Sequence, residues 1–380
     1  MTADQDRKYQ SPQPVASARP PLVVIADDLT GACDPAVAFT AACGPVRIQI
    51  NGGPLEAASV QATTTQSRDI AVADAEARVR SIAQRFPSNV ELFKKIDSVF
   101  RGNTVAEIAA ILRYARYDLA VLAPAYPALG RVVREGILRI RDTSGDRTLP
   151  IAELLAKFGC SLGVLPAGLP SDALVPAVRR SLNSTQPSIL CDAANHDDLE
   201  RIVGAARSLG KRILWIGSGG LAHALAAGLT PLARQPASVP RPGHTILFIG
   251  TAHPVTRAQV ERLQIAEHRS DATHSLATDL LIPVMLGETS ADKIRAAVAT
   301  RDPARTACLF MTGGDTAHFV CRALGIDALR LEREFAPGVP LAIAEGGPFD
   351  GVSVVLKSGG FGEPDLLCRL LEACRQEVIA

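Results

Sequence analysis

The sequence is poor in aromatic residues, has no excess charge of either sign and contains no long apolar run. Only 4% of its 380 residues are aromatic, and 40 basic side chains balance 39 acidic ones. Broad binding to nucleic acid or anionic lipid needs clustered basic charge, so this balance argues against both kinds of partner. No apolar run approaches the ~18–20 residues of a membrane-spanning helix. We therefore expect no nucleic-acid partner and no membrane partner.

The eight cysteines lack the spacing of a metal site or a redox pair. No Cys-x-x-Cys occurs, and no histidine stands near a cysteine at the spacing of metal ligands. Residues 1–20 contain no apolar segment of the kind found in a signal peptide. We therefore expect reduced, buried cysteines, a cytoplasmic location and a flexible tail over residues 1–20.

What the sequence does contain is typical of a folded protein with two domains. Hydrophobic residues make up 47% and charged residues 21% of the chain, and a domain usually has roughly 100–200 residues. The clearest interruption is the proline-rich stretch 231–243. It predicts a linker between an N-terminal domain at 21–230 and a C-terminal domain at 244–380.

Short apolar segments rich in β-branched residues alternate with segments of helical periodicity. This alternation predicts an α/β fold, with two α/β domains and largely parallel sheets. The expected strands are 22–26, 46–50, 91–96, 118–123, 188–191, 213–216, 245–249, 307–311 and 352–356. The expected helices include 71–85, 104–115, 197–209, 255–266 and 292–299.

Two carboxylates, Asp27 and Asp28, directly follow the first expected strand and precede a Thr-Gly turn. Ligands of open parallel sheets bind beyond the carboxyl ends of the strands. Adjacent carboxylates there can orient hydroxyls, hold a metal ion or accept a proton. A helix-capping Asp with a solvated neighbour explains the same pair, so the residues alone leave both interpretations open.

A second polar group, Lys95, Asp97, Ser98 and Arg101, precedes another expected helix. Arg binds carboxylates through two parallel hydrogen bonds and Asp accepts from hydroxyls, so the group suits an acid that carries hydroxyls. Side chains alternate along a strand, so Lys94 faces away from Lys95. A solvated charged loop is the alternative.

Glycine-rich loops follow three expected strands of the C-terminal half. Bare amides at helix N-termini bind phosphates, although neither a P-loop nor a dinucleotide fingerprint is present. An ordinary turn explains each loop taken alone, and His253 either contacts a nucleotide or caps its loop. The candidate nucleotide-binding residues are Gly250, Thr251, His253, Gly313, Gly314, Asp315, Thr316, Gly359 and Gly360.

In this order the segments resemble the four-carbon acid sugar kinase family, which includes threonate, erythronate and 3-oxo-tetronate kinases. The strongest matches are residues 26–32 (ADDLTGA), 94–98 (KKIDS), 101–103 (RGN) and 123–131 (APAYPALGR). The resemblance implies a sugar-acid-binding domain at 21–230, a nucleotide-binding domain at 244–380, and phosphoryl transfer from ATP, with Mg²⁺, in an active-site cleft between them.

The resemblance also implies roles for individual residues. Asp27 or Asp28 would act as the base that activates the acceptor hydroxyl, with Asp97 as orienting partner. Arg101 and Lys95 would bind the substrate carboxylate or the transferred phosphoryl group. The implied catalytic residues are Asp27, Asp28, Asp97 and Arg101; the implied substrate ligands are Asp28, Arg68, Lys95, Asp97, Ser98 and Arg101. Metal ligands are not assigned.

Departures from the family pattern keep alternatives open. Val99 stands where the family has Thr, and three glycine-rich loops differ on the nucleotide side. These changes are compatible with a non-catalytic relative that binds nucleotide or sugar acid. An unrelated α/β enzyme, such as a dehydrogenase or an aldolase, is a further alternative, and the sequence leaves a homodimer open.

Overall fold

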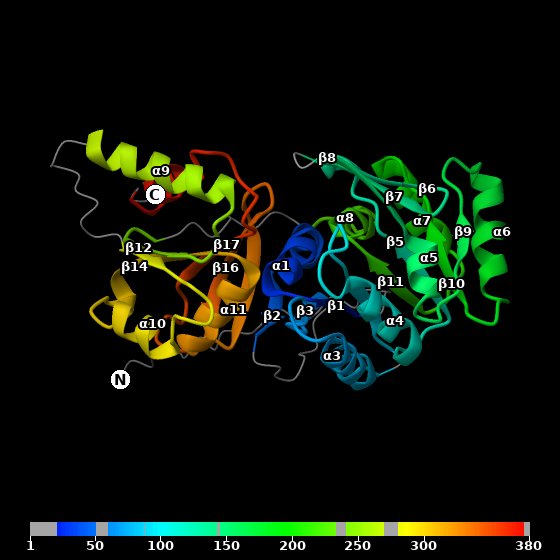
Figure 1. The fold of residues 1–380 in the computed structure, drawn as a ribbon, viewed down its shortest axis with the longest axis horizontal. Helices are drawn as coiled ribbons and strands as arrows, with labels where there is room; N and C mark the ends of the chain where they lie inside the picture. The colour runs from blue at the N-terminus through cyan, green and yellow to red at the C-terminus, as the bar shows by residue number, and fades with distance from the viewer. Residues whose placement is uncertain are drawn as a thin grey trace, which may run out of the picture.

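The computed structural model describes residues 21–50, 60–87, 89–142, 145–232, 241–269 and 280–375. The expected tail at 1–20 lies outside these residues, as do residues 233–240 of the expected linker. The described chain alternates between strands and helices around one long sheet (Figure 1). The predicted α/β class is confirmed.

Parallel strands of the N-terminal half form one end of this sheet, in the order β2-β3-β1-β4-β11-β5-β10-β9. Most are short runs of buried residues, as expected for parallel strands covered on both faces. Six of them were expected from the sequence, whereas β3 and β9 were not. The bounds are β1 (Leu22–Ala26), β2 (Val46–Gln49), β3 (Val60–Thr64), β4 (Glu91–Lys95), β5 (Leu119–Ala123), β9 (Gly163–Leu165), β10 (Ser188–Cys191) and β11 (Ile213–Gly217).

Two groups of helices pack along these strands (Figure 1). In the first group α4 contacts α3 and α5, and in the second α1 contacts α8, α8 contacts α7, and α7 contacts α6. The first group consists of α3 (Val72–Arg85), α4 (Thr104–Tyr114) and α5 (Ile151–Ala156). The second consists of α1 (Leu29–Val37), α6 (Ser171–Ser181), α7 (His196–Arg207) and α8 (Gly219–Ala227), and the short α2 (Thr40–Cys43) follows α1.

A separate three-stranded antiparallel sheet follows β5 and the turn η1 (Pro127–Leu129). It consists of β6 (Arg131–Arg134), β7 (Ile137–Asp142) and β8 (Gly145–Pro150). Arg131, the last residue of the motif at 123–131, begins β6. Strand β8 is largely exposed, so its hydrophobic pattern is too weak to mark it as a strand.

The C-terminal half combines parallel strands with an antiparallel hairpin. Strands β12, β13, β14 and β17 are parallel, whereas β15 and β16 pair antiparallel. The hairpin was not expected from the sequence. The strands are β12 (His244–Ile249), β13 (Leu280–Pro283), β14 (Thr306–Thr312), β15 (Ala328–Ala336), β16 (Val339–Glu345) and β17 (Ser353–Lys357). The helices are α9 (Pro254–Arg269), α10 (Ala291–Val298), η3 (Pro303–Arg305), α11 (Gly314–Ala323) and α12 (Leu366–Arg375).

The hairpin joins the two halves into one sheet. Strand β15 pairs antiparallel with β2, and the partners run from Ala328 opposite Gln49 to Leu331 opposite Val46. An ion pair of 2.5 Å between Arg47 Nε and Glu345 Oε2 supports the junction. Helix α1 also contacts α11, β15 and β16 of the C-terminal half. The N-terminus of α1, where Asp28 lies, is therefore held against both halves.

Two of the buried charged side chains, Lys94 and Glu107, form an ion pair beneath β4. Their side chains are 0% and 2% exposed, and Lys94 Nζ lies 2.8 Å from Glu107 Oε2. The ammonium also donates to the carbonyl of Lys95, and Ser67 Oγ donates to Glu107. Among the described residues no helix is long and apolar enough to cross a membrane.

Replacing Glu107 by Ala leaves the Lys94 ammonium buried without its counter-charge. We expect the free energy of unfolding to fall by about 3–5 kcal/mol at pH 7, because removal of one partner of a buried ion pair leaves the charge of the other uncompensated. Urea denaturation measures the change. The exposed Glu153 on α5 provides the control, and equal effects of Glu107→Ala and Glu153→Ala would refute a stabilising pair.

Candidate active site

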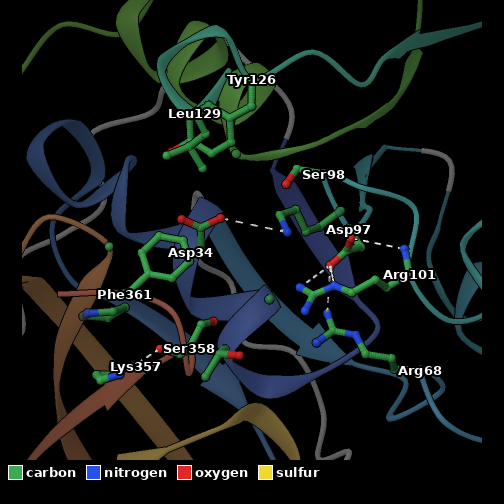
Figure 2. Close-up of a pocket in the computed structure, with 16 residues that line it drawn as sticks. Asp34, Arg68, Asp97, Ser98, Arg101, Tyr126, Leu129, Lys357, Ser358 and Phe361 are labelled. Atoms are coloured by element: carbon green, nitrogen blue, oxygen red, sulfur yellow. Dashed lines mark hydrogen bonds and ion pairs between the residues drawn. The ribbon is translucent and has the colours of Figure 1, made fainter. Parts of the chain in front are cut away.

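A pocket lies where the carboxyl ends of β1, β4 and β17 approach one another (Figure 2). Both halves of the chain line it. From the N-terminal half come Thr30, Gly31, Asp34, Arg68, Lys95, Asp97, Ser98, Arg101, Tyr126, Leu129 and Gly219. From the C-terminal half come Gly338, Pro340, Lys357, Ser358 and Phe361. The substrate ligands expected from the sequence therefore line this pocket, apart from Asp28.

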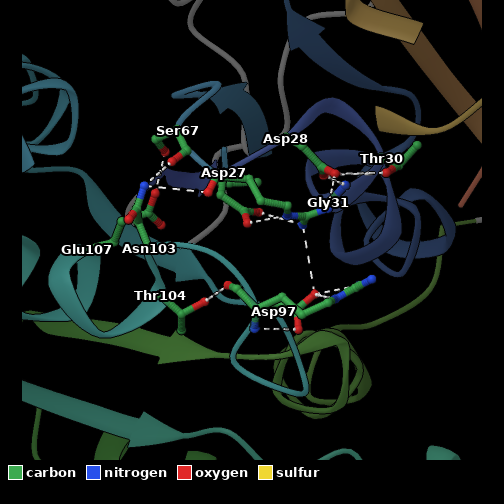
Figure 3. Close-up of polar contacts among 12 residues, drawn as sticks. Asp27, Asp28, Thr30, Gly31, Ser67, Asp97, Asn103, Thr104 and Glu107 are labelled. Carbon is green, nitrogen blue, oxygen red and sulfur yellow. Dashed lines mark hydrogen bonds and ion pairs between the residues drawn. The ribbon is translucent and has the colours of Figure 1, made fainter. Parts of the chain in front are cut away.

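Asp27 and Asp28, both labelled in Figure 3, share the guanidinium of Arg68. Arg68 Nε is 2.8 Å from Asp27 Oδ2, Nη2 is 3.0 Å from Asp27 Oδ1, and Nη1 donates to Asp28 Oδ2. The two carboxylate side chains are only 3% and 2% exposed. Their geometry suits holding an arginine more than contacting a ligand directly.

The pair lies where it does because β1 ends at Ala26 and Asp28 caps α1. The Asp28 carboxylate accepts from the amide of Gly31, at the helix start. Burial and, to a smaller extent, the charge of Asp27 raise the pKa of Asp28 to about 6. Burial also acts to raise the pKa of Asp27, but Arg68 and Lys94 hold it below its ordinary value. One guanidinium thus serves two adjacent carboxylates with different proton affinities.

Asp97 organises the second loop. Its Oδ1 accepts from the amides of Val99 and Arg101, at 2.9 and 3.1 Å, and its Oδ2 accepts from Arg101 Nε and Nη2, at 3.0 and 2.7 Å. Burial acts to raise the pKa of Asp97, yet the Arg101 hydrogen bonds and charge lower it to about 2. Gly102 has φ +64°, and a Cβ there would lie 2.6 Å from the Arg68 carbonyl, so this turn needs glycine. The turn brings Arg68 and Arg101 to one carboxylate.

Strand alternation separates the two lysines of β4 as the sequence predicts. Lys94 faces Glu107, whereas Lys95 lines the pocket, where its Nζ is 3.9 Å from Asp34 Oδ2. Asp34 was missed in the sequence analysis, although it follows Thr30 and Gly31 by four and three residues and so shares their face of α1. Tyr126 was missed as well; its hydroxyl lies 3.3 Å from His223 Nε2.

The glycine-rich loops of the C-terminal half form two groups. The first surrounds the start of α9: a Cβ on Gly359 or Gly360 would touch His253, and one on Gly359 would lie 2.9 Å from Thr251 Oγ1. The His253 ring accepts from the amide of Val255 at 3.3 Å, so it caps the helix. None of these residues lines the pocket of Figure 2, but Thr251 lines a second depression beside α9 with Ile249, Thr256, Arg257, Val260 and Glu261.

The second group touches the carboxylates of the N-terminal half. A Cβ on Gly314 would lie 2.3 Å from Asp28 Oδ2, so only glycine permits this approach. Burial, followed by the charge of Asp69, raises the pKa of the neighbouring Asp315. Thr316 packs against Gly250. A Cβ on Gly250 would lie 1.9 Å from the hydroxyl oxygen of Thr316. Gly313–Thr316 therefore connects Asp28 to the loop after β12.

Lys357 lies between the pocket of Figure 2 and the depression beside α9. It was not among the ligands expected from the sequence. Its Nζ donates to Thr256 Oγ1 at 2.8 Å and to the carbonyl of Gly359 at 2.9 Å. The residue is fully buried, and no carboxylate of the described residues pairs with it. Burial lowers the pKa of Lys357 to about 8. A buried cation without counter-charge, at the junction of two depressions, is suited to an anionic group of a ligand.

The described residues contain no cluster of three or more His, Cys, Asp or Glu side chains that could hold a metal ion. Mg²⁺ that enters with nucleotide phosphates needs only one or two protein carboxylates.

Comparisons with known proteins agree with this arrangement of two different halves. Residues 22–225 match the family described as "Sugar-binding N-terminal domain", and residues 268–367 match "Nucleotide-binding C-terminal domain". The architecture also resembles a crystal structure of a Haemophilus influenzae protein, with a TM-score of 0.70 and 19% identity over 93% of this chain and 100% of that one. The chain is thus an α/β protein whose N-terminal part matches a sugar-binding family and whose C-terminal part matches a nucleotide-binding family.

Curated relatives identify the family within that class. A D-threonate kinase of Bordetella bronchiseptica is 32% identical over 94% of this chain and 98% of the relative. A D-erythronate kinase of Heliobacterium modesticaldum is 26% identical over 92% and 96%, and a 3-oxo-tetronate kinase of Brucella melitensis is 26% identical over 94% and 96%. The chain belongs to the four-carbon acid sugar kinase family, which confirms the resemblance seen in its motifs.

The lowered pKa of Lys357 gives a test of its environment. The unfolded chain keeps the proton up to its ordinary pKa of 10.5, whereas the folded protein loses it near pH 8. Between these values the unfolded state binds more protons, so the stability of the wild type relative to Lys357→Met rises with pH, by roughly 1–3 kcal/mol.

Urea denaturation at several pH values between 7.5 and 10.5 measures this difference. Replacement of the exposed Lys211 by Met serves as the matched control, because its ammonium is solvated in both states. A flat difference between the wild type and Lys357→Met would contradict a desolvated ammonium.

Proposed function

We propose that this protein is an ATP-dependent kinase that phosphorylates a hydroxyl of a four-carbon sugar acid of the threonate, erythronate or 3-oxo-tetronate type. The observation that carries the proposal is one pocket lined by Lys95, Asp97 and Arg101 from one half and by Lys357 and Ser358 from the other. Cations suit a carboxylate and a phosphoryl group, and the carboxylates suit hydroxyls. The names of the curated relatives support the same substrate class.

On the sugar side, Arg101 binds the carboxylate of the acid, and Lys95 faces Asp34 in the same pocket. Arg101 is presented by Asp97, and its side chain remains 67% exposed, so it can take a further ligand. Arg68, held by Asp27 and Asp28, adds a second guanidinium at 3.9 Å from Asp97 Oδ2. Ser98 supplies a hydroxyl at the same edge.

On the nucleotide side, ATP extends from the depression beside α9 to the pocket between the halves. Ile249 and Val260 give that depression an apolar wall for the base. The phosphates then pass the start of α9, where Gly250, Thr251, Gly359 and Gly360 leave backbone exposed. Lys357 and the Gly313–Thr316 loop lie further along this path, towards Asp28. Mg²⁺ bound to the phosphates would offset their charge.

Substrate entry requires the halves to separate. The cavity between them is about 60 Å³, whereas small-molecule sites usually have roughly 300–1,000 Å³. The expected domains, 21–230 and 244–380, are joined by the predicted linker 231–243 and by the β2–β15 pairing, so we propose that this pairing acts as the hinge. Closure over both substrates would exclude water from the transferred phosphoryl group.

Assembly and location remain predictions. We predict a cytoplasmic protein from the composition and retain a homodimer as a prediction. Size-exclusion chromatography with light scattering distinguishes a monomer of 40.0 kDa from a dimer.

The activity is tested by measuring ADP release with ATP, Mg²⁺ and a panel of four-carbon acids that includes D-threonate, D-erythronate and 3-oxo-tetronate. We expect one acid to support turnover. Replacing Arg101 by Ala should lower kcat/KM for that acid by about 10- to 100-fold, the value of a charge-assisted hydrogen bond. The exposed Arg179 on α6 provides the matched control, Arg179→Ala. Nucleotide binding without ADP release for any acid would favour a non-catalytic relative.

A further inference from the structure

The proposed transfer requires a group that takes the proton from the acceptor hydroxyl, and such a group needs a carboxylate oxygen that is accessible and not already saturated with donors. The sequence suggested Asp28 or Asp27 for this role. In the structure the oxygens of both residues accept from Arg68 or from the amide of Gly31, and both side chains are almost fully buried. Neither residue lines the pocket.

Asp97 lines the pocket but is similarly occupied. Its two oxygens accept four hydrogen bonds from Val99 and Arg101, and its side chain is 5% exposed. Asp34 is different, because its side chain is 24% exposed and its one ion-pair contact among the described residues is to Lys95. Of the carboxylates that line the pocket, Asp34 therefore has unused oxygen lone pairs.

The distance between Asp34 and Lys95 leaves room for a ligand atom. Lys95 Nζ lies 3.9 Å from Asp34 Oδ2, which is longer than a direct hydrogen bond. A hydroxyl between them would donate to Asp34 and accept from Lys95. Gly219 keeps this space open, since a Cβ there would lie 2.9 Å from Asp34 Oδ2.

Asp34 also lies between the groups proposed for the two substrates. Figure 2 shows its carboxylate between Ser98 on the sugar side and Phe361 and Ser358 on the nucleotide side. A hydroxyl bound to Asp34 would therefore face the phosphates that pass Lys357. Asp27 and Asp28, whose carboxylates bind Arg68, do not line the pocket.

We propose that Asp34 is the catalytic base of the transfer and that Lys95 orients the acceptor hydroxyl; this inference rests on the proposed kinase function. The O–H bond of the hydroxyl breaks and its proton passes to Asp34 Oδ2. The hydroxyl oxygen forms a bond to the γ-phosphorus of ATP. The bond from this phosphorus to the bridging oxygen breaks, and ADP leaves with that electron pair.

The test compares Asp34→Asn with the wild type, because Asn keeps the shape of the side chain but cannot take the proton. We expect kcat to fall by about 10²- to 10⁴-fold, with KM for the acid changed by less than about threefold. Asp34→Glu should recover part of kcat.

A matched control and two binding measurements separate catalysis from structure. Asp197→Asn, at an exposed position on α7, should retain the wild-type kcat. Thermal-shift titrations of Asp34→Asn with the acid and with a non-hydrolysable ATP analogue should match those of the wild type. If Asp34→Asn melts at a lower temperature or binds the acid more weakly, by enough to explain the fall in kcat, the catalytic role is overturned. Asp34 would then have a structural or binding role.

Failure of this inference differs from failure of the proposed function. A wild type that phosphorylates an acid while Asp34→Asn retains kcat within about fivefold overturns the base assignment alone. A wild type that turns over no acid of the panel overturns both.

Discussion

One guanidinium between two buried carboxylates is the interaction on which the site depends. Asp27 and Asp28 follow β1 directly, and their burial is tolerable because Arg68 binds both. The same contact joins the end of β1, the start of α1 and the loop after β3. Gly314 of the other half lies against Asp28, so the two halves meet on this cluster. Asp34, roughly 1.7 turns further along α1, is thereby directed into the pocket.

Pairing of β15 with β2 determines how the halves face each other. Without it, the N-terminal and C-terminal strands would form two separate sheets. With it, one sheet runs through the molecule, and the loops at the carboxyl ends of β1, β4 and β17 meet over one pocket. Four residue pairs form this ladder.

Three lysines show how partners decide between structural and functional roles. Lys94 is neutralised by Glu107 and belongs to the core, whereas its neighbour Lys95 faces a carboxylate across a gap. Lys357 is as buried as Lys94 but is surrounded by a hydroxyl and carbonyl oxygens. Burial by itself does not distinguish these residues. The presence or absence of a matching carboxylate does, and that depends on packing between segments far apart in the chain.

The sequence by itself determined the α/β class, the positions of most parallel strands, the division of side chains between Lys94 and Lys95, and the family. These follow from local hydrophobic patterns, strand alternation and short motifs. Only the tertiary structure decided that Asp27 and Asp28 hold Arg68, that Asp34 and Lys357 reach the pocket, and that the hairpin of β15 and β16 joins the two halves. Those outcomes depend on distances between segments remote in sequence, and local periodicity carries no information about such distances.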